Sequence, residues 1–108
     1  MLLAFPDKEA EVPIVAVFEA AGFTQEAYEE TVRRLTEGGG PLASPSDWPV
    51  EGLLAHAAGQ GANGFRVVDV WESADAFQRF GETLLPMLED RGIEGEPEVY
   101  PAHTFVAA

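Results

Sequence analysis

The chain has 108 residues, of which 46% are hydrophobic, and its 19 acidic and 6 basic side chains give a formal net charge of −13. The length is typical of one domain, and the hydrophobic fraction excludes a chain too polar to build a core. The negative charge would repel polyanions, which excludes nucleic acid and anionic membrane surfaces as expected partners. The absence of cysteine excludes disulfides, thiolate metal sites and cysteine nucleophiles. No signal peptide or membrane-spanning run is visible, so a cytoplasmic location is expected by default.

The chain before the first predicted helix divides into a leader and a strand. Residues 1–11 are charged and lack a clear periodicity, so a leader that could be partly disordered is expected. Residues 12–19 are rich in β-branched side chains and predict the first strand. A single domain is expected over residues 12–106.

A helix is predicted over residues 25–36. Thr24 is a suitable N-cap, because its hydroxyl can accept a hydrogen bond from the first turn. Tyr28, Val32 and Leu35 recur at the helical period and form one apolar stripe. A run of three glycines and a proline then ends the helix.

The stretch over residues 37–51 is irregular, contains three prolines and is long for a connection within a compact domain. It could be a lid over a functional site, since long loops often carry function. It could equally be a surface loop whose Trp48 fills a gap in the core. Both interpretations stay open.

The second half of the chain alternates strand and helix patterns. The predicted elements are a strand over 53–59, a turn over 60–64, a strand over 65–72, a helix from the cap Ser73 to a stop at Gly92, and a strand over 98–106. Pro86 should kink or restart the second helix. Pro101 should place the last strand at a sheet edge or introduce a bulge.

The order strand, helix, strand, strand, helix, strand is that of the ferredoxin-like βαββαβ arrangement. The predicted fold class is therefore α+β, with a four-stranded antiparallel sheet and two helices on one face. The other face of such a sheet must be polar or covered by something else. This requirement predicts a second copy of the chain, paired sheet to sheet.

Alternation along 65–72 assigns side chains to the two faces of the sheet. Val68 and Val70 suit the helix side. The opposite face then carries Phe65, Val67 and Trp71 around an aspartate, and a face this apolar should not meet water. We expect the partner subunit to cover it and a substrate site to lie there, beneath the sheet.

The turn adds residues from the neighbouring strand to that face. If Gly59 pairs with Gly64, His56 lies opposite Val67 and Leu54 lies opposite Asp69. His56, Asp69 and Trp71 then share one face, with Leu54, Val67 and Phe65 as further substrate-binding residues. A slip of one residue would send His56 to the other face, so this inference depends on the turn.

His56 and Asp69 are the main catalytic candidates. A histidine beside a carboxylate can act as an acid, a base or a hydrogen-bond donor, but His56 could also be a satisfied interior side chain. Asp69 is unusual in the middle of a strand and could orient His56, or it could form an ion pair across a dimer interface.

The other candidates are less well placed by the sequence. His103 follows Pro101 and is a third catalytic candidate, although it could be structural or exposed. Trp71 could be the floor of an aromatic-binding pocket or part of the core. Glu19 and Tyr28 are further polar candidates.

No metal or cofactor site is predicted. His56, Asp69 and His103 could in principle hold a metal, but the chain has no local metal-ligand spacing. The glycines of residues 59–64 match G-x-G-x-x-G, yet this stretch lies between two strands and does not open a helix. Without that context, the match does not indicate a dinucleotide site.

Residues 64–73, followed by Ala76 and Phe77, resemble a signature of the dimeric α/β-barrel superfamily, in which a strand leads into W-E-S and then A-F. The antibiotic biosynthesis monooxygenase-like group is the most similar. The resemblance covers residues 12–106. It implies a homodimer whose two sheets form a barrel, each sheet lining its own cavity.

The superfamily includes cofactor-independent oxygenases of phenolic polyketides, haem-degrading enzymes, muconolactone-type isomerases and polyketide cyclases. Trp71 matches an aromatic residue that lines the cavity of the quinone-forming oxygenases. Those enzymes carry an asparagine where this chain has Val67, which is a departure from the oxygenase pattern. His56 and Asp69 instead suggest acid–base work, as in an isomerase or cyclase.

Three hypotheses follow. The first is an enzyme for a hydrophobic, aromatic or polyketide-like substrate, either monooxygenase-like or an acid–base isomerase or cyclase, that needs no cofactor. The second is a binding or accessory protein with the same cavity and no chemistry. The third is a structural dimer that fills its own cavity, which a pocket below about 300 Å³ would favour.

Overall fold

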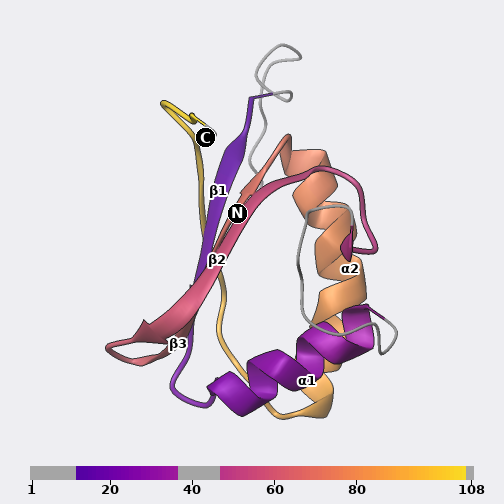
Figure 1. The fold of residues 1–108 in the computed structure, drawn as a ribbon, viewed down its shortest axis with the longest axis vertical. Helices are drawn as coiled ribbons and strands as arrows, with labels where there is room; N and C mark the ends of the chain where they lie inside the picture. The colour runs from indigo at the N-terminus through magenta and orange to yellow at the C-terminus, as the bar shows by residue number, and fades with distance from the viewer. Residues whose placement is uncertain (1–11, 37–46, 107–108) are drawn as a thin grey trace.

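The computed structural model describes residues 12–36 and 47–106, so the leader and most of the 37–51 stretch lie outside the described residues. Within them, the elements are β1 (Ile14–Glu19), α1 (Gln25–Leu35), β2 (Leu53–Gly61), β3 (Gly64–Trp71), α2 (Ala74–Asp90) and β4 (Glu98–Pro101). The strands form one antiparallel sheet in the order β2-β3-β1-β4, and both helices lie on the same side of it (Figure 1). The predicted ferredoxin-like α+β fold is confirmed.

Both helices begin where the capping signals predict. The hydroxyl of Thr24 accepts a hydrogen bond from the backbone N–H of Ala27 at 3.1 Å. The hydroxyl of Ser73 accepts one from Ala76 at 3.1 Å. Each cap satisfies a backbone donor that has no partner inside its helix. α2 continues through Pro86 without restarting, so of the two expected effects of this proline only a kink stays a prediction.

The last strand is shorter than predicted. β4 ends at Pro101, whereas the sequence pattern suggested a strand to residue 106. Proline has no N–H to donate, and the sheet pairing closes one residue later, where the N–H of Ala102 donates to the carbonyl of Pro13 at 2.8 Å. His103 therefore lies beyond the sheet.

The hairpin between β2 and β3 is tighter than predicted. Gly61 pairs with Gly64, where the sequence suggested Gly59, and the connection has two residues. Gly64 has a φ of +145°, and a Cβ there would meet the carbonyl oxygen of Ala20 at 1.9 Å, so only glycine fits. The register moves by two residues, which places His56 opposite Asp69 and not Val67. Because the shift is even, His56 keeps its predicted face.

The helices cover the face of β3 that the sequence analysis assigned to a partner subunit. Trp71 stacks on Phe80 of α2 with ring centroids 4.9 Å apart, and Phe65 packs against Tyr28 of α1 at 5.0 Å. Val68 and Val70 lie on the opposite, uncovered face. The predicted assignment of the two faces is therefore wrong: the amphipathic helices bury the aromatic face because rings from both sides interlock there.

The uncovered face of the sheet is also apolar. Val15 and Val17 of β1 pair with Val70 and Val68 of β3, and Tyr100 of β4 pairs with Val15. Tyr100 is 44% exposed. Over residues 12–36 and 47–106, no helix is long and apolar enough to cross a membrane.

Candidate functional site

The polar centre of the covered face is a pair between neighbouring strands. His56 of β2 and Asp69 of β3 are directly opposite, and the Nδ1 atom of His56 lies 2.5 Å from the Oδ1 atom of Asp69. The two side chains are 10% and 7% exposed. An ionised carboxylate can only accept, so Nδ1 carries the proton of this hydrogen bond.

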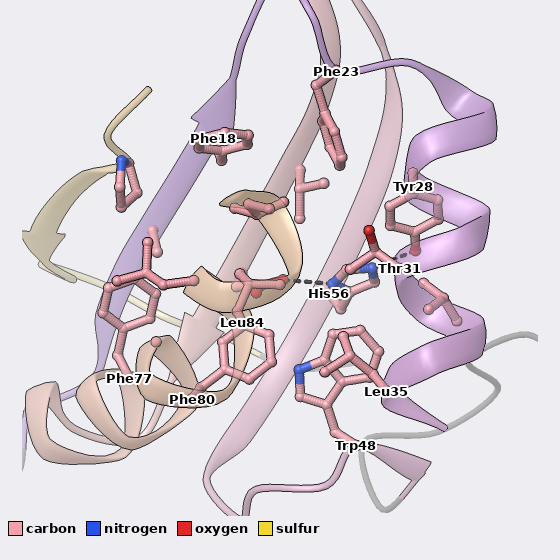
Figure 2. Close-up of a pocket in the computed structure, with 18 of the residues that line it drawn as sticks. Phe18, Phe23, Tyr28, Thr31, Leu35, Trp48, His56, Phe77, Phe80 and Leu84 are labelled. Atoms are coloured by element: carbon pink, nitrogen blue, oxygen red, sulfur yellow. Dashed lines mark hydrogen bonds and ion pairs between the residues drawn. The ribbon is translucent and has the colours of Figure 1, made fainter. Parts of the chain in front are cut away.

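Tyr28 of α1 extends this pair toward the helices. Its hydroxyl lies 2.6 Å from the Nε2 atom of His56, and the two rings stack with centroids 5.8 Å apart. Since Nδ1 of a neutral imidazole holds the proton, Nε2 accepts the hydrogen bond that the Tyr28 hydroxyl donates. The result is a chain in which Tyr28 donates to His56 and His56 donates to Asp69. Figure 2 shows the Tyr28 and His56 side chains of this chain facing each other.

Burial and the nearby Asp69 carboxylate raise the pKa of Tyr28 above its ordinary value. Both effects disfavour a phenolate, because a buried charge is costly and a second negative charge would face the first. Tyr28 therefore holds its proton at neutral pH. This proton is the one donated to His56.

The second oxygen of Asp69 contacts Trp71. The indole Nε1 donates to Oδ2 at 3.4 Å, and Trp71 is fully buried between β3 and α2. Its ring packs against Phe77 and Phe80. Trp71 thus fixes the carboxylate from behind as part of the core. It does not line the pocket described next, so the expectation that it forms a pocket floor is not met.

A pocket of about 200 Å³ lies between the sheet and the two helices. Tyr28, His56 and Asp69 line it, together with Val67 and Thr31. Most of its wall is apolar, and the aromatic residues around it are Phe18, Phe23, Tyr28, Trp48, Phe77 and Phe80 (Figure 2). Exposed Leu85 and Pro97 also belong to the lining and mark a side that reaches solvent.

Trp48 comes from the end of the irregular stretch and closes one end of this pocket. It is 7% exposed, and its ring lies 5.3 Å from that of His56 and 5.5 Å from that of Phe80. This agrees with the interpretation in which Trp48 packs into the core. Residues 37–46, on which the lid interpretation also depends, lie outside the described residues.

The structure brings some predicted residues together and separates others. His56, Asp69 and Val67 meet at the pocket. His103 is exposed and lies beyond β4, so it does not join them. Leu54 is 37% exposed at a β-bulge that turns it off the predicted register. Phe65 is buried against Phe23 and Tyr28 and does not line the pocket.

The sequence indicated Tyr28 only as a further polar candidate, and Trp48 only as a side chain that could fill a gap in the core. The signal for Tyr28 was a polar tip on an otherwise apolar helix stripe. Glu19, named with Tyr28, lies elsewhere: it accepts from the N–H of Asn63 at 2.8 Å and from Arg66 at 3.1 Å. These contacts, first that with Asn63, lower the pKa of Glu19 and fasten the hairpin end.

A metal site is not supported by the described part of the chain. Across residues 12–36 and 47–106, no three His, Asp or Glu side chains are grouped so that they could hold an ion. His103, which is exposed beyond β4, is not grouped with His56 and Asp69 in the described part of the chain. The polar atoms at the pocket instead suit proton transfer.

Comparison with known proteins identifies the fold. A candidate monooxygenase from Shewanella loihica PV-4 matches with a TM-score of 0.53 and 18% identity, over 87% of this chain and 97% of that one. A mutant of SnoaB, a cofactor-independent oxygenase from Streptomyces nogalater, matches with a TM-score of 0.54 and 18% identity, over 92% and 99% of the two chains. No protein-family model matches this sequence, and no curated protein does. At these identities the similarity is one of fold, and it agrees with the resemblance seen in the sequence.

Proposed function

We propose that this protein is a cofactor-independent enzyme that moves a proton on a small hydrophobic, aromatic substrate held between the helices and the sheet. The observation that carries the proposal is the Tyr28–His56–Asp69 hydrogen-bond chain, which lines an apolar pocket. A carboxylate, an imidazole and a hydroxyl in series form the arrangement that activates a terminal group for acid–base work.

The proposed step uses only this chain's side chains. The Tyr28 oxygen takes a proton from the substrate while its own proton passes to Nε2 of His56. The imidazolium that forms is stabilised by Asp69, whose carboxylate is 2.5 Å from Nδ1. Reversal of the same transfers returns a proton to the substrate, so charge and protons balance over the cycle.

The substrate is small. A volume of about 200 Å³ is below the range of roughly 300 Å³ and above that is typical of ligand sites, and volume alone therefore favours a structural cavity. Yet an apolar cavity of about 150 Å³ in another protein binds benzene. The pocket has room for one ring or two small fused rings, which narrows the expected aromatic substrate and argues against a large polyketide.

Isomerase or cyclase chemistry fits the lining better than oxygenation. Both begin with removal of a substrate proton. An oxygenase must then direct the carbanion to dioxygen. SnoaB, which has a similar fold, is a cofactor-independent oxygenase. In the resemblance drawn from sequence, Val67 replaces the asparagine of such enzymes and offers no hydrogen bond. The Tyr28–His56 pair can return the proton, which is what an isomerase requires.

The proposed enzyme is a homodimer. The support is the uncovered sheet face, where exposed Ala57 of β2 pairs with half-buried Val68 of β3, and half-buried Val15 of β1 pairs with Val70. Pairing two such faces would remove this apolar surface from water. The pocket lies on the other face of the sheet, so each subunit would carry a complete site.

Exchange of carbon-bound hydrogen tests the proposal without the natural substrate. The probe is 2-indanone in D2O, whose benzylic hydrogens next to the carbonyl are replaced by deuterium when a base removes them. Proton NMR follows their loss. We expect the protein to accelerate exchange above the buffer rate. His56→Gln and Tyr28→Phe should each reduce the protein-dependent rate about 100-fold.

The chain supplies a matched control, because it has two histidines. His103→Gln alters the exposed one and should leave the exchange rate unchanged. Equal rates in His56→Gln and the unaltered protein would reject the assigned roles. Tight binding of the probe without any exchange would favour the alternative function, a non-catalytic binding or accessory protein with the same cavity.

A further inference from the structure

The indole N–H of Trp48 has no hydrogen-bond partner among residues 12–36 and 47–106, although the residue is only 7% exposed. Buried donors are nearly always bonded, because leaving one unpaired costs about 1–3 kcal/mol. Trp48 is therefore an exception that needs a physical reason. Figure 2 shows its nitrogen on the edge of the ring that faces Phe80 and the middle of the pocket.

The chain's other tryptophan shows that this exception is not a general property of indoles in this fold. Trp71 is just as deeply buried, but its Nε1 donates to Asp69. Trp71 does not line the pocket, whereas Trp48 does. The unpaired donor thus occurs at the tryptophan that a bound molecule could reach.

The side chains around Trp48 leave its N–H free to donate to an acceptor on a bound molecule. Its ring contacts those of His56 and Phe80, and the nearby pocket lining adds Leu35 and Leu84. Both nitrogens of His56 are already engaged, by Asp69 and Tyr28. No acceptor from the described part of the chain is in reach of the indole N–H.

We infer that the Trp48 N–H is a substrate-binding donor, and that the substrate carries an acceptor oxygen, a carbonyl, on its apolar ring system. This inference rests on the proposed function and names its substrate class. Trp48 and Tyr28 flank the His56 ring, with centroids 5.3 and 5.8 Å from it. A carbonyl oxygen at Trp48 places the adjacent C–H on the side of Tyr28.

A hydrogen bond from Trp48 to a substrate carbonyl has a chemical consequence. Removal of a proton next to a carbonyl moves negative charge onto the carbonyl oxygen. A preorganised N–H donor in a water-poor site stabilises this developing charge. Trp48 would therefore stabilise the enolate oxygen more strongly than the ketone oxygen. Tyr28 would receive the proton that leaves the substrate.

A pair of matched probes tests the inference by binding alone. Indane and 2-indanone have the same ring system, and only the second has a carbonyl oxygen. Dissociation constants of both are measured by NMR titration of the unaltered protein and of Trp48→Phe. The ratio of the two constants, compared between proteins, cancels the different hydration of the probes.

We expect Trp48→Phe to reduce the preference for 2-indanone about tenfold, since one hydrogen bond is lost. His103→Gln is the control, because His103 is exposed beyond β4 and does not line the pocket, and its preference should equal that of the unaltered protein. In the unaltered 15N-labelled protein, 2-indanone should move the Trp48 indole signal downfield and indane should not. This measurement holds even if a variant fails to fold.

The outcomes separate this inference from the proposed function. Equal preference in Trp48→Phe and the unaltered protein, with an unmoved indole signal, overturns the role of Trp48. Deuterium exchange that still depends on Tyr28 and His56 would then leave the acid–base site standing. If neither probe binds, the inference is overturned, and the exchange assay decides the proposed function separately.

Discussion

The two faces of β3 place polar and apolar side chains in opposite ways. The face toward the helices contains Asp69, whose side chain is 7% exposed and bonded to His56 and Trp71. The face away from the helices contains Val68 and Val70, which no other layer of the described structure covers. The face of β3 toward the helices is thus more polar at its centre than the face away from them.

This contrast distinguishes side chains explained by packing from a side chain explained by function. Valines on an uncovered face cost free energy unless something covers them, which is the argument for a dimer. A carboxylate inside is costly unless it is paired, and Asp69 is paired twice. The covered face has therefore retained a polar group that a purely structural core would not need.

The largest expected effect tests the packed end of the covered face. Trp71→Ala removes a fully buried ring that stacks on Phe80, so we expect the free energy of unfolding to fall by about 4 kcal/mol. Urea denaturation measures it. Val70→Ala, on the other face of the same strand, should cost much less in the monomer. Equal losses would contradict the assignment of the faces.

The next effect tests the polar centre. Asp69→Ala leaves the donors of His56 and Trp71 buried without an acceptor, and we expect a loss of about 3 kcal/mol in the free energy of unfolding. Arg66→Ala removes the solvent-exposed pair with Glu19 and should cost much less than Asp69→Ala, because solvent screens that pair. If Asp69→Ala destabilised the protein no more than Arg66→Ala does, the expected contribution of the His56–Asp69 pair to stability would be contradicted.

A third test addresses the uncovered face. Val68→Asp puts a charge at the centre of the proposed dimer interface and repeats it across the symmetry axis. We expect the dimer dissociation constant to rise about 100-fold or more, while the monomer stays folded. Light scattering after size exclusion at several concentrations measures it. Val68→Thr, of the same shape and uncharged, is the control. A monomer in the unaltered protein would reject the dimer.

The smallest effect is a pH dependence from Tyr28. Its pKa is raised in the folded state, first by burial and then by Asp69, so the unfolded chain loses this proton at lower pH. The resulting stabilisation is complete below the unfolded pKa of about 10 and is lost as pH rises through the folded pKa. Urea midpoints between pH 8 and 11 should therefore fall more steeply in the unaltered protein than in Tyr28→Phe. Parallel curves would contradict the shift.

Much of the fold could be predicted from local signals. Thr24 and Ser73 began the helices as expected, because an N-cap acts on its own first turn. The order of the elements was enough to predict the ferredoxin-like sheet. The register of β2 on β3 was harder to predict than the pairing itself, because Gly59, Gly61 and Gly64 are all residues at which a turn can close.

The candidate site was predicted in part. His56 and Asp69 were named, and an even shift of register left them on one face. Tyr28 was given little weight, because its contact with His56 depends on how α1 packs on the sheet. Trp48 looked like packing alone, since a sequence does not show whether a buried N–H finds an acceptor.

The sequence by itself determined the elements, their order and the residues able to carry a proton, because these depend on periodicity, caps and side-chain chemistry within a few residues. Only the tertiary structure decided which face of β3 the helices cover. Both faces contain enough apolar side chains to be buried, and the choice follows from how Phe80 and Tyr28 interlock with Trp71 and Phe65. That packing also decided that the pocket lies between the helices and the sheet.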